Sequence, residues 1–167
     1  MLRFLCLMVF LVSCSQDRDM DIYNKCLHEF AIETNQNYGL KYLGGGGRMC
    51  NKIEQTSLLF SFHNDLSLDE ARSIFVAISR EWLEWINENE DLREYLAVYP
   101  FERNNIEIAL VHNNFTDAGV NPACIVTVGV VNDRVFFNRY DIESQETVQV
   151  SVESYSELMS QGSSRSE

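Results

Sequence analysis

The stretch that decides the fold is Leu66–Asn89, LSLDEARSIFVAISREWLEWINEN. It opens with a capping box, because Ser67 and Glu70 have the spacing at which each side chain accepts a hydrogen bond from the other's backbone. Apolar residues then recur every three or four positions, which is the period of one helix face. We therefore predict an amphipathic helix from Leu68 to about Asn89. Its apolar stripe is Ala71, Ile74, Phe75, Ile78, Trp82, Trp85 and Ile86.

Strand-like segments surround this helix. Alternating or continuous apolar residues mark 53–63, 105–111, 124–131, 134–140 and 147–152, and Asn132-Asp133 is a two-residue hairpin signal. A further amphipathic helix is expected at 19–36, a short helix at 91–96 and a last helical turn at 154–160. Consecutive strands near the end favour an antiparallel meander. We expect an α+β fold, an antiparallel sheet of about four to five strands with two main helices packed on one face, in two layers.

The length and composition allow one domain. The chain has 167 residues, of which we assign 20–160 to the domain and 161–167 to a disordered tail. Its 25 acidic residues outnumber its 13 basic ones, which gives a formal net charge of −12. Such a chain repels phosphate backbones, so we expect no nucleic-acid partner.

The N-terminal segment has the pattern of a targeting signal. Arg3 is followed by a short apolar run, Phe4–Val12, which is too short to span a membrane and fits a signal peptide covering residues 1–13. The residues Leu11-Val12-Ser13-Cys14 resemble the lipobox of bacterial lipoproteins. That resemblance implies a diacylglycerol thioether at Cys14 and a membrane partner through the lipid. The polar residues that follow it predict a tether over 14–19. The alternative is an ordinary secretory signal with a chance cysteine.

The lipoprotein resemblance also bears on location. Residues that follow the lipidated cysteine direct sorting in that family, and Ser15 slightly favours the outer over the inner membrane. The body, from Ile86–Leu96 through Tyr99-Pro100-Phe101 and Asn105-Ile106, is similar to small uncharacterised lipoproteins of intracellular bacteria. That family has no assigned activity, so the similarity transfers no functional residue.

Three of the five cysteines remain after the signal peptide and the lipidated residue are set aside. They are Cys26, Cys50 and Cys124, an odd number in a compartment that permits disulfides. A Cys26–Cys50 disulfide is one of three pairings that the sequence leaves open. Cys124 lies in an apolar run and is expected to be a buried small hydrophobe.

Cys50 and His112 suggest a hydrolase. A thiolate at Cys50, with His112 as its base and Asp117 or Asp133 orienting the imidazole, would form a catalytic set. The order resembles that of cell-wall cysteine peptidases. However, those enzymes place the cysteine at a helix start, whereas Cys50 precedes a strand. An inert or disulfide-bonded cysteine is the alternative.

Two further patterns lack a complete motif. Gly44–Gly47 lacks the lysine and hydroxyl of a phosphate loop, so we expect a flexible connection. His28, His63 and His112 lie far apart without a metal-binding spacing, and we expect no metal and no cofactor. His63, which begins the sequence His63-Asn64-Asp65, is interpreted as a turn histidine.

Aromatic residues gather in the middle of the chain. They are Trp82, Trp85, Tyr95, Tyr99 and Phe101, which either pack in the core or line a partly exposed groove for a peptide, lipid or protein partner. An acidic set accompanies them, Glu81, Glu84, Glu88, Glu90, Asp91 and Glu94. Such a run is usually a solvated face, and a cationic partner is the alternative.

The sequence thus favours a lipid-anchored cell-envelope protein that acts by binding, without a complete catalytic set. An unknown envelope or host protein is the expected kind of partner beyond the membrane. A small cysteine hydrolase using Cys50 and His112 is the first alternative, and a structural envelope component is the second.

Overall fold

The computed structural model describes residues 14–114 and 121–161. The expected signal peptide at 1–13 and the tail residues 162–167 lie outside the described residues. The helices are α1 (Cys14–Tyr38), α2 (Leu68–Glu88), α3 (Glu90–Arg93), the 3-10 turn η1 (Arg103–Asn105) and α4 (Tyr155–Gln161). The strands are β1 (Lys41–Met49), β2 (Ile53–Phe62), β3 (Ile106–His112), β4 (Thr127–Val131), β5 (Arg134–Asp141) and β6 (Glu146–Ser154).

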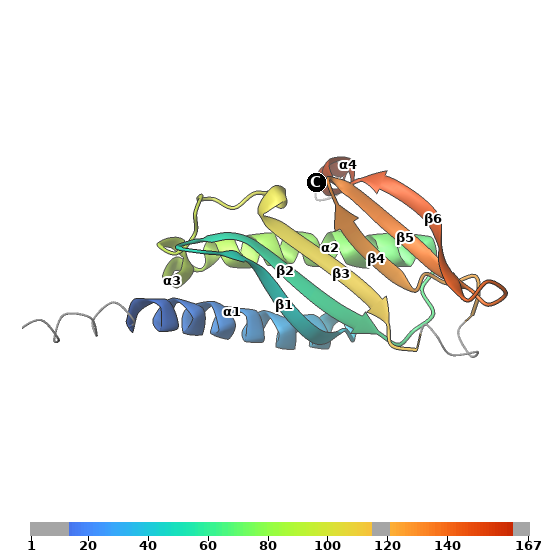
Figure 1. Cartoon of the computed structure of the whole chain (residues 1–167), viewed down its shortest axis with the longest axis horizontal. Coiled ribbons are helices and arrows are strands. Elements are labelled where there is room, and N and C mark those ends of the chain that lie inside the picture. The colour runs from blue at the N-terminus through green and yellow to red at the C-terminus, as the bar shows by residue number, and fades with distance from the viewer. Residues whose placement is uncertain (1–13, 115–120, 162–167) are drawn as a thin grey trace, which may run out of the picture.

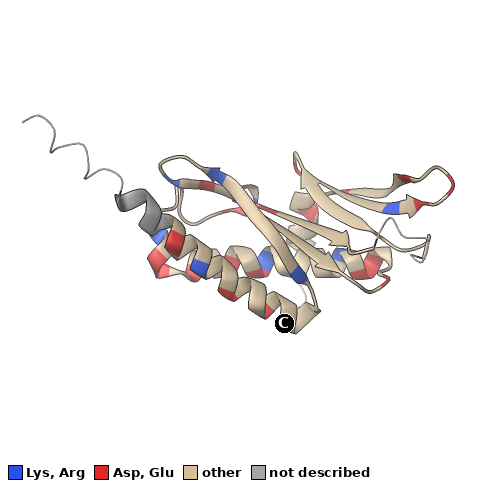
Figure 2. Ribbon diagram, turned by 60° about the horizontal axis from the view of Figure 1, so that its bottom comes forward, with Lys and Arg blue, Asp and Glu red and all other residues tan. Residues whose placement is uncertain are grey.

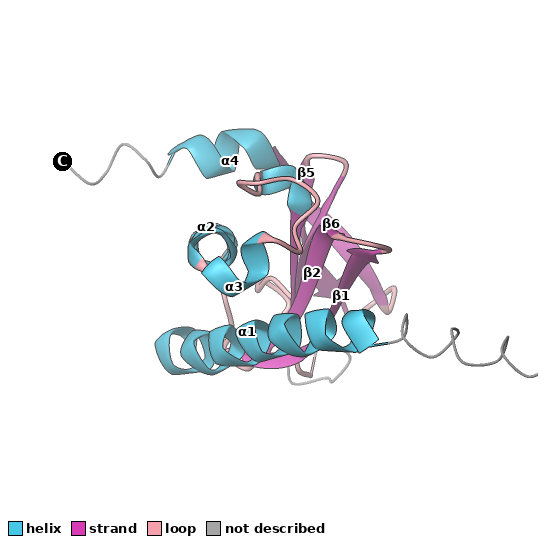
Figure 3. Ribbon diagram, turned by 90° about the vertical axis from the view of Figure 1, so that its left-hand side faces the viewer, coloured by secondary structure: helices cyan, strands magenta, loops and turns pink. Residues whose placement is uncertain are grey.

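The strands form one sheet in chain order, β1-β2-β3-β4-β5-β6 (Figure 1). The helices pack on one side of it, which confirms the two-layer α+β fold (Figure 3). The structure differs from the prediction in two details. The sheet has six strands, and β2 pairs with β3 in parallel, while every other neighbouring pair is antiparallel. The parallel pair arises because α2 connects β2 to β3 and returns the chain to the same end of the sheet.

The strand that the sequence did not predict is β1, which contains the glycine run that we had expected to be a flexible connection. Its glycines allow the strand to approach its neighbours closely. A Cβ added at Gly45 would lie 2.6 Å from the Tyr42 hydroxyl and 3.2 Å from Cδ1 of Leu27. At Gly47, where φ is +150°, a Cβ would lie 1.9 Å from the backbone oxygen of Gln55. Side chains would therefore prevent β1 from pairing with β2 as it does.

The central helix α2 forms as predicted. The Ser67 side chain accepts from the Glu70 backbone N–H at 3.3 Å, and the Glu70 carboxylate accepts from the Ser67 N–H at 2.9 Å. The apolar stripe faces the sheet, and Phe75, Ile78, Trp82 and Ile86 are fully buried. These side chains join β2, β3, β5 and α1 in one hydrophobic core.

The first helix begins earlier than predicted. The residues expected as a tether, 14–19, are the first turns of α1, which runs without a break to Tyr38. The helix is held in place further along, where Tyr23, Cys26, Leu27 and Phe30 are buried in the core. Once these turns are packed, each additional helical residue costs little, so the helix continues beyond the packed region.

Candidate functional site

The two residues of the hydrolase hypothesis lie far apart. Cys50 is exposed in the turn between β1 and β2, beside Ile53 at the start of β2. His112 pairs with Phe62 at the other end of β2. The 10-residue strand between them is about 30 Å long at roughly 3.3 Å per residue. The structure therefore does not bring this thiol and imidazole together.

His112 is also fully engaged where it lies. Its Nε2 lies 3.1 Å from the His63 backbone oxygen, and its Nδ1 accepts from the Asn114 backbone N–H at 3.2 Å. The ring packs edge-on against Phe62. Both ring nitrogens already have partners, so neither is available to take a proton from a nucleophile. Of the proposed orienting residues, Asp117 lies outside the described residues.

The three cysteines whose side chains the structure describes are free. Cys26 and Cys124 are buried and Cys50 is exposed, so the possible Cys26–Cys50 disulfide is not formed. Cys26 lies in the core between α1 and the other helices, whereas Cys50 is in a surface turn. Burial raises the pKa of the Cys26 thiol to about 11. The expectation that Cys124 is a buried hydrophobe is confirmed.

These environments predict selective thiol reactivity. With iodoacetamide at pH 8, we expect the folded chain to be alkylated at Cys50 and not at Cys26 or Cys124, because a thiolate must be both formed and accessible to react. Peptide mass spectrometry after brief labelling measures this. Labelling in urea is the control and should reach all three thiols. Protection of Cys26 and Cys50 together in urea, reversed by a reductant, would show a disulfide and contradict the structure.

The aromatic residues belong mostly to the core. Trp82 is 0% exposed and its Nε1–H donates to the Thr56 hydroxyl at 2.9 Å. Phe101 is buried as well, and Trp85 and Tyr95 pack against the core. Tyr99 is the exception at 47% exposed, with the Arg93 guanidinium 4.4 Å from its ring centroid. These five residues therefore form no apolar groove.

The acidic set lies along α2 and α3. Glu84, Glu88, Glu90, Asp91 and Glu94 are exposed to solvent. Glu81 is partly buried and accepts a hydrogen bond from the Tyr38 hydroxyl. This arrangement fits the usual interpretation of such a run, a solvated helix face.

A surface that the sequence did not indicate lies on the other side of the sheet. We call the side that faces away from α2 the outer face. A central row crosses it from edge to edge, because the register pairs each residue with the next: Gly44, Leu59, Ala109, Gly129, Phe136 and Val152. All six are apolar. In Figure 2 the strands are mostly uncharged, and the charged residues gather on the helices and near the strand ends.

The central row contains a hollow, the outer groove. It has a volume of about 550 Å³ and is lined by Gly44–Gly46, Ser57–Leu59, Glu107–Ala109 and Gly129–Val131. Small residues create it, since a Cβ at Gly44, Gly46 or Gly129 would meet nothing within 4 Å. The groove is therefore space that larger side chains would fill.

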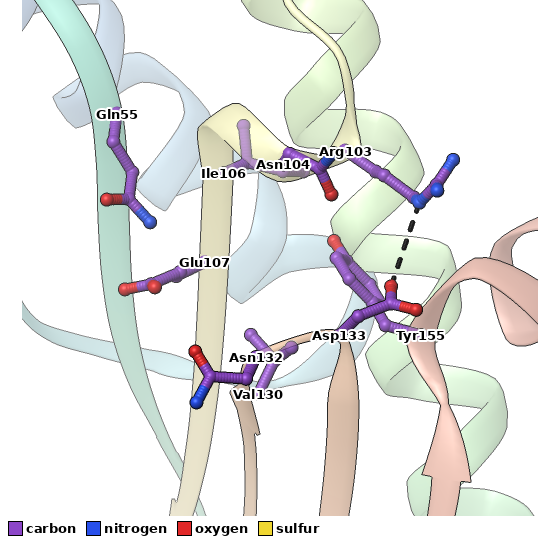
Figure 4. A pocket seen from close by; sticks show the side chains of 9 residues that line it. All are labelled: Gln55, Arg103, Asn104, Ile106, Glu107, Val130, Asn132, Asp133 and Tyr155. Atoms are coloured by element: carbon purple, nitrogen blue, oxygen red, sulfur yellow. Dashed lines mark ion pairs between the residues drawn. The ribbon is translucent and has the colours of Figure 1, made fainter.

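Beside the groove, β3 and β4 part from one another. Their register covers only Ala109–Val111 against Thr127–Gly129, and the strands then diverge towards the start of β3 (Figure 1). A second hollow of about 200 Å³, the polar cleft, lies at this opening (Figure 4). It is lined by Gln55, Arg103, Asn104, Ile106, Glu107, Val130, Asn132, Asp133 and Tyr155.

The polar cleft holds charges of both signs. The Arg103 Nε lies 3.8 Å from Oδ1 of Asp133 and makes no hydrogen bond. Asp133 is fixed by the predicted Asn132-Asp133 hairpin, in which both residues have positive φ (50° and 60°). Glu107 accepts from the Ser57 hydroxyl at 3.0 Å. In Figure 4, Gln55 and Glu107 lie on one side of β3 and Arg103 and Asp133 on the other.

The comparisons with known proteins name no relative. No protein family, curated protein or solved structure matches the chain. Among the side chains that the structure describes, no three or more His, Cys, Asp or Glu residues are arranged to hold a metal ion. Across residues 14–114 and 121–161, no helix is both long and apolar enough to cross a membrane.

Proposed function

We propose that this chain is a lipid-anchored protein of the bacterial cell envelope that acts by binding rather than by catalysis, with the outer groove as its binding site. The lipobox residues Leu11–Cys14 support the anchor, and Ser15 favours the outer membrane. The separation of Cys50 from His112 leaves the hydrolase alternative without a catalytic pair among the described residues.

The outer groove is the observation that carries the binding function. An antiparallel sheet face that is left to solvent is usually polar, whereas the central row is apolar in every strand. Gly44, Ala109 and Gly129 keep this surface hollow where larger side chains would cover it. An apolar ligand group that enters such a hollow displaces water from apolar surface, which is favourable.

Filling the groove should remove binding without unfolding the chain. We expect Gly129→Leu to lower the affinity for a monoacylglycerol, a neutral amphiphile, at least about tenfold, because the new side chain occupies the hollow. The backbone tolerates the change, since Gly129 has no positive φ and open space at its Cβ. Native mass spectrometry of the full chain, purified from membranes in detergent, counts the bound amphiphile.

The matched control is Val150→Leu, an exposed position on β6 that lines neither hollow. It should bind the monoacylglycerol like the parent chain, and both variants should melt at the parent's temperature. If Gly129→Leu binds as well as the parent, the outer groove is not the binding site and this part of the proposal is lost.

A further inference from the structure

We infer that the occupant of the outer groove is a single aminophospholipid molecule, with an acyl chain in the groove and the head group in the polar cleft. This inference rests on the proposed function and adds the chemistry of the ligand. A hollow with an apolar length and a charged end is complementary to an amphiphile. The two parts must be continuous for one molecule to occupy both.

The groove and the cleft are continuous because they share lining residues. Glu107 and Val130 line both hollows. These two residues lie where β3 and β4 separate, beyond the last paired residues Ala109 and Gly129. A chain lying along the small residues of the groove therefore reaches the cleft at the gap between the strands.

The charges of the cleft select the head group. Glu107 lies at the junction, and no basic side chain of the described ranges forms an ion pair with it. Its hydrogen bond from Ser57 leaves carboxylate lone pairs free for an ammonium group. Arg103 supplies the opposite charge; its Nε makes no hydrogen bond and lies 3.8 Å from Oδ1 of Asp133, an ion pair that leaves its other guanidinium donors for a phosphate. A guanidinium fits a phosphate. An ammonium and a phosphate on one head group satisfy both residues.

The anchor would place the groove near its ligand. Figure 3 shows the N-terminal end of α1 on the same side of the molecule as the sheet, whereas α2 and α4 lie on the opposite side. A lipid on Cys14 would therefore hold the outer face towards the membrane. An aminophospholipid of that membrane reaches the groove without crossing solvent.

Three probes with the same acyl chain separate the contributions. Lysophosphatidylethanolamine carries an ammonium and a phosphate, lysophosphatidylglycerol carries the phosphate alone, and the monoacylglycerol carries neither. We expect affinities for the full chain in detergent to fall in that order, with about tenfold between successive probes, as charge-assisted hydrogen bonds are lost. Native mass spectrometry measures each affinity.

Two variants test which residue causes each difference in affinity between the probes. Glu107→Gln keeps an acceptor for Ser57 and should abolish only the preference for lysophosphatidylethanolamine over lysophosphatidylglycerol. Arg103→Gln should abolish the preference for lysophosphatidylglycerol over the monoacylglycerol, while lysophosphatidylethanolamine keeps its advantage over lysophosphatidylglycerol. Arg134→Gln, a charge change on β5 that lines neither hollow, is the control and should change nothing.

The outcomes distinguish this inference from the function on which it rests. If the parent chain binds all three probes equally, and Gly129→Leu abolishes that binding, the aminophospholipid assignment is wrong while the groove remains a binding site. If none of the three probes binds the parent chain, both the assignment and the proposed groove function are overturned.

Discussion

Replacing Trp82 with alanine is expected to unfold most of the chain at 37 °C. The side chain is fully buried, its ring centroid lies 4.8 Å from that of Phe30, and its Nε1–H donates to the buried Thr56 hydroxyl. Truncation of a buried tryptophan costs about 3–5 kcal/mol. Leaving the Thr56 hydroxyl unsatisfied adds about 1–3 kcal/mol. A domain has only about 5–15 kcal/mol of stability to lose.

Urea denaturation followed by fluorescence and circular dichroism measures this loss. Trp82→Phe keeps most of the packing and removes the hydrogen bond, so its effect should lie between those of the alanine variant and the parent. Tyr99→Ala is the surface control and should cost less than about 1 kcal/mol. A Trp82→Ala chain that kept its stability but lost amphiphile binding would contradict the core assignment and move the binding site to the aromatic residues.

Local signals predicted the helices and most strands because the residues that decide them are close in sequence. The Ser67–Glu70 capping box and the apolar period after it define α2 without help from the rest of the chain. The Asn132-Asp133 turn likewise encodes its own hairpin, since both residues tolerate a positive φ. These features are short-range, and the structure confirms them.

The glycine strand was missed because its stability is not local. Gly44–Gly47 has a low intrinsic strand preference, and its pairing with β2 holds it extended. The parallel pairing of β2 and β3 was missed for a related reason. Alternation indicates that a segment is a strand, but the direction of its neighbour depends on the path of α2.

The outer groove could not be predicted from the sequence because it depends on register. Gly44, Leu59, Ala109 and Gly129 are distant in the chain and adjoin only in one alignment of four strands. A register slip of one residue in any of these strands would turn that strand's residue of the central row towards the core. The bulge between Tyr42 and Gly44 shifts the register of β1 against β2, and no sequence pattern predicts this bulge.

The lipid anchor is the second prediction with a large expected effect. Chain purified from its host's membranes should have the mass of residues 14–167 plus acyl groups, and Cys14→Ser should lose the acyl mass entirely. The thioether needs a sulfur nucleophile, and serine supplies none. Each buried CH₂ of an acyl chain contributes about 0.8 kcal/mol to membrane affinity, and two or more chains hold a protein stably.

Detergent phase partition gives the second measurement. The parent should enter the detergent-rich phase. A Cys14→Ser chain that lacks the apolar run Phe4–Val12 should move to the aqueous phase. Cys50→Ser is the matched control, because its thiol is exposed in the folded domain and its loss should leave mass and partition otherwise unchanged. Because α1 runs from Cys14 to Tyr38, an acyl group on Cys14 would be joined to the domain through a helix. Acyl mass that persists in Cys14→Ser would show attachment elsewhere, and it would also remove the reason for placing the outer face against the membrane.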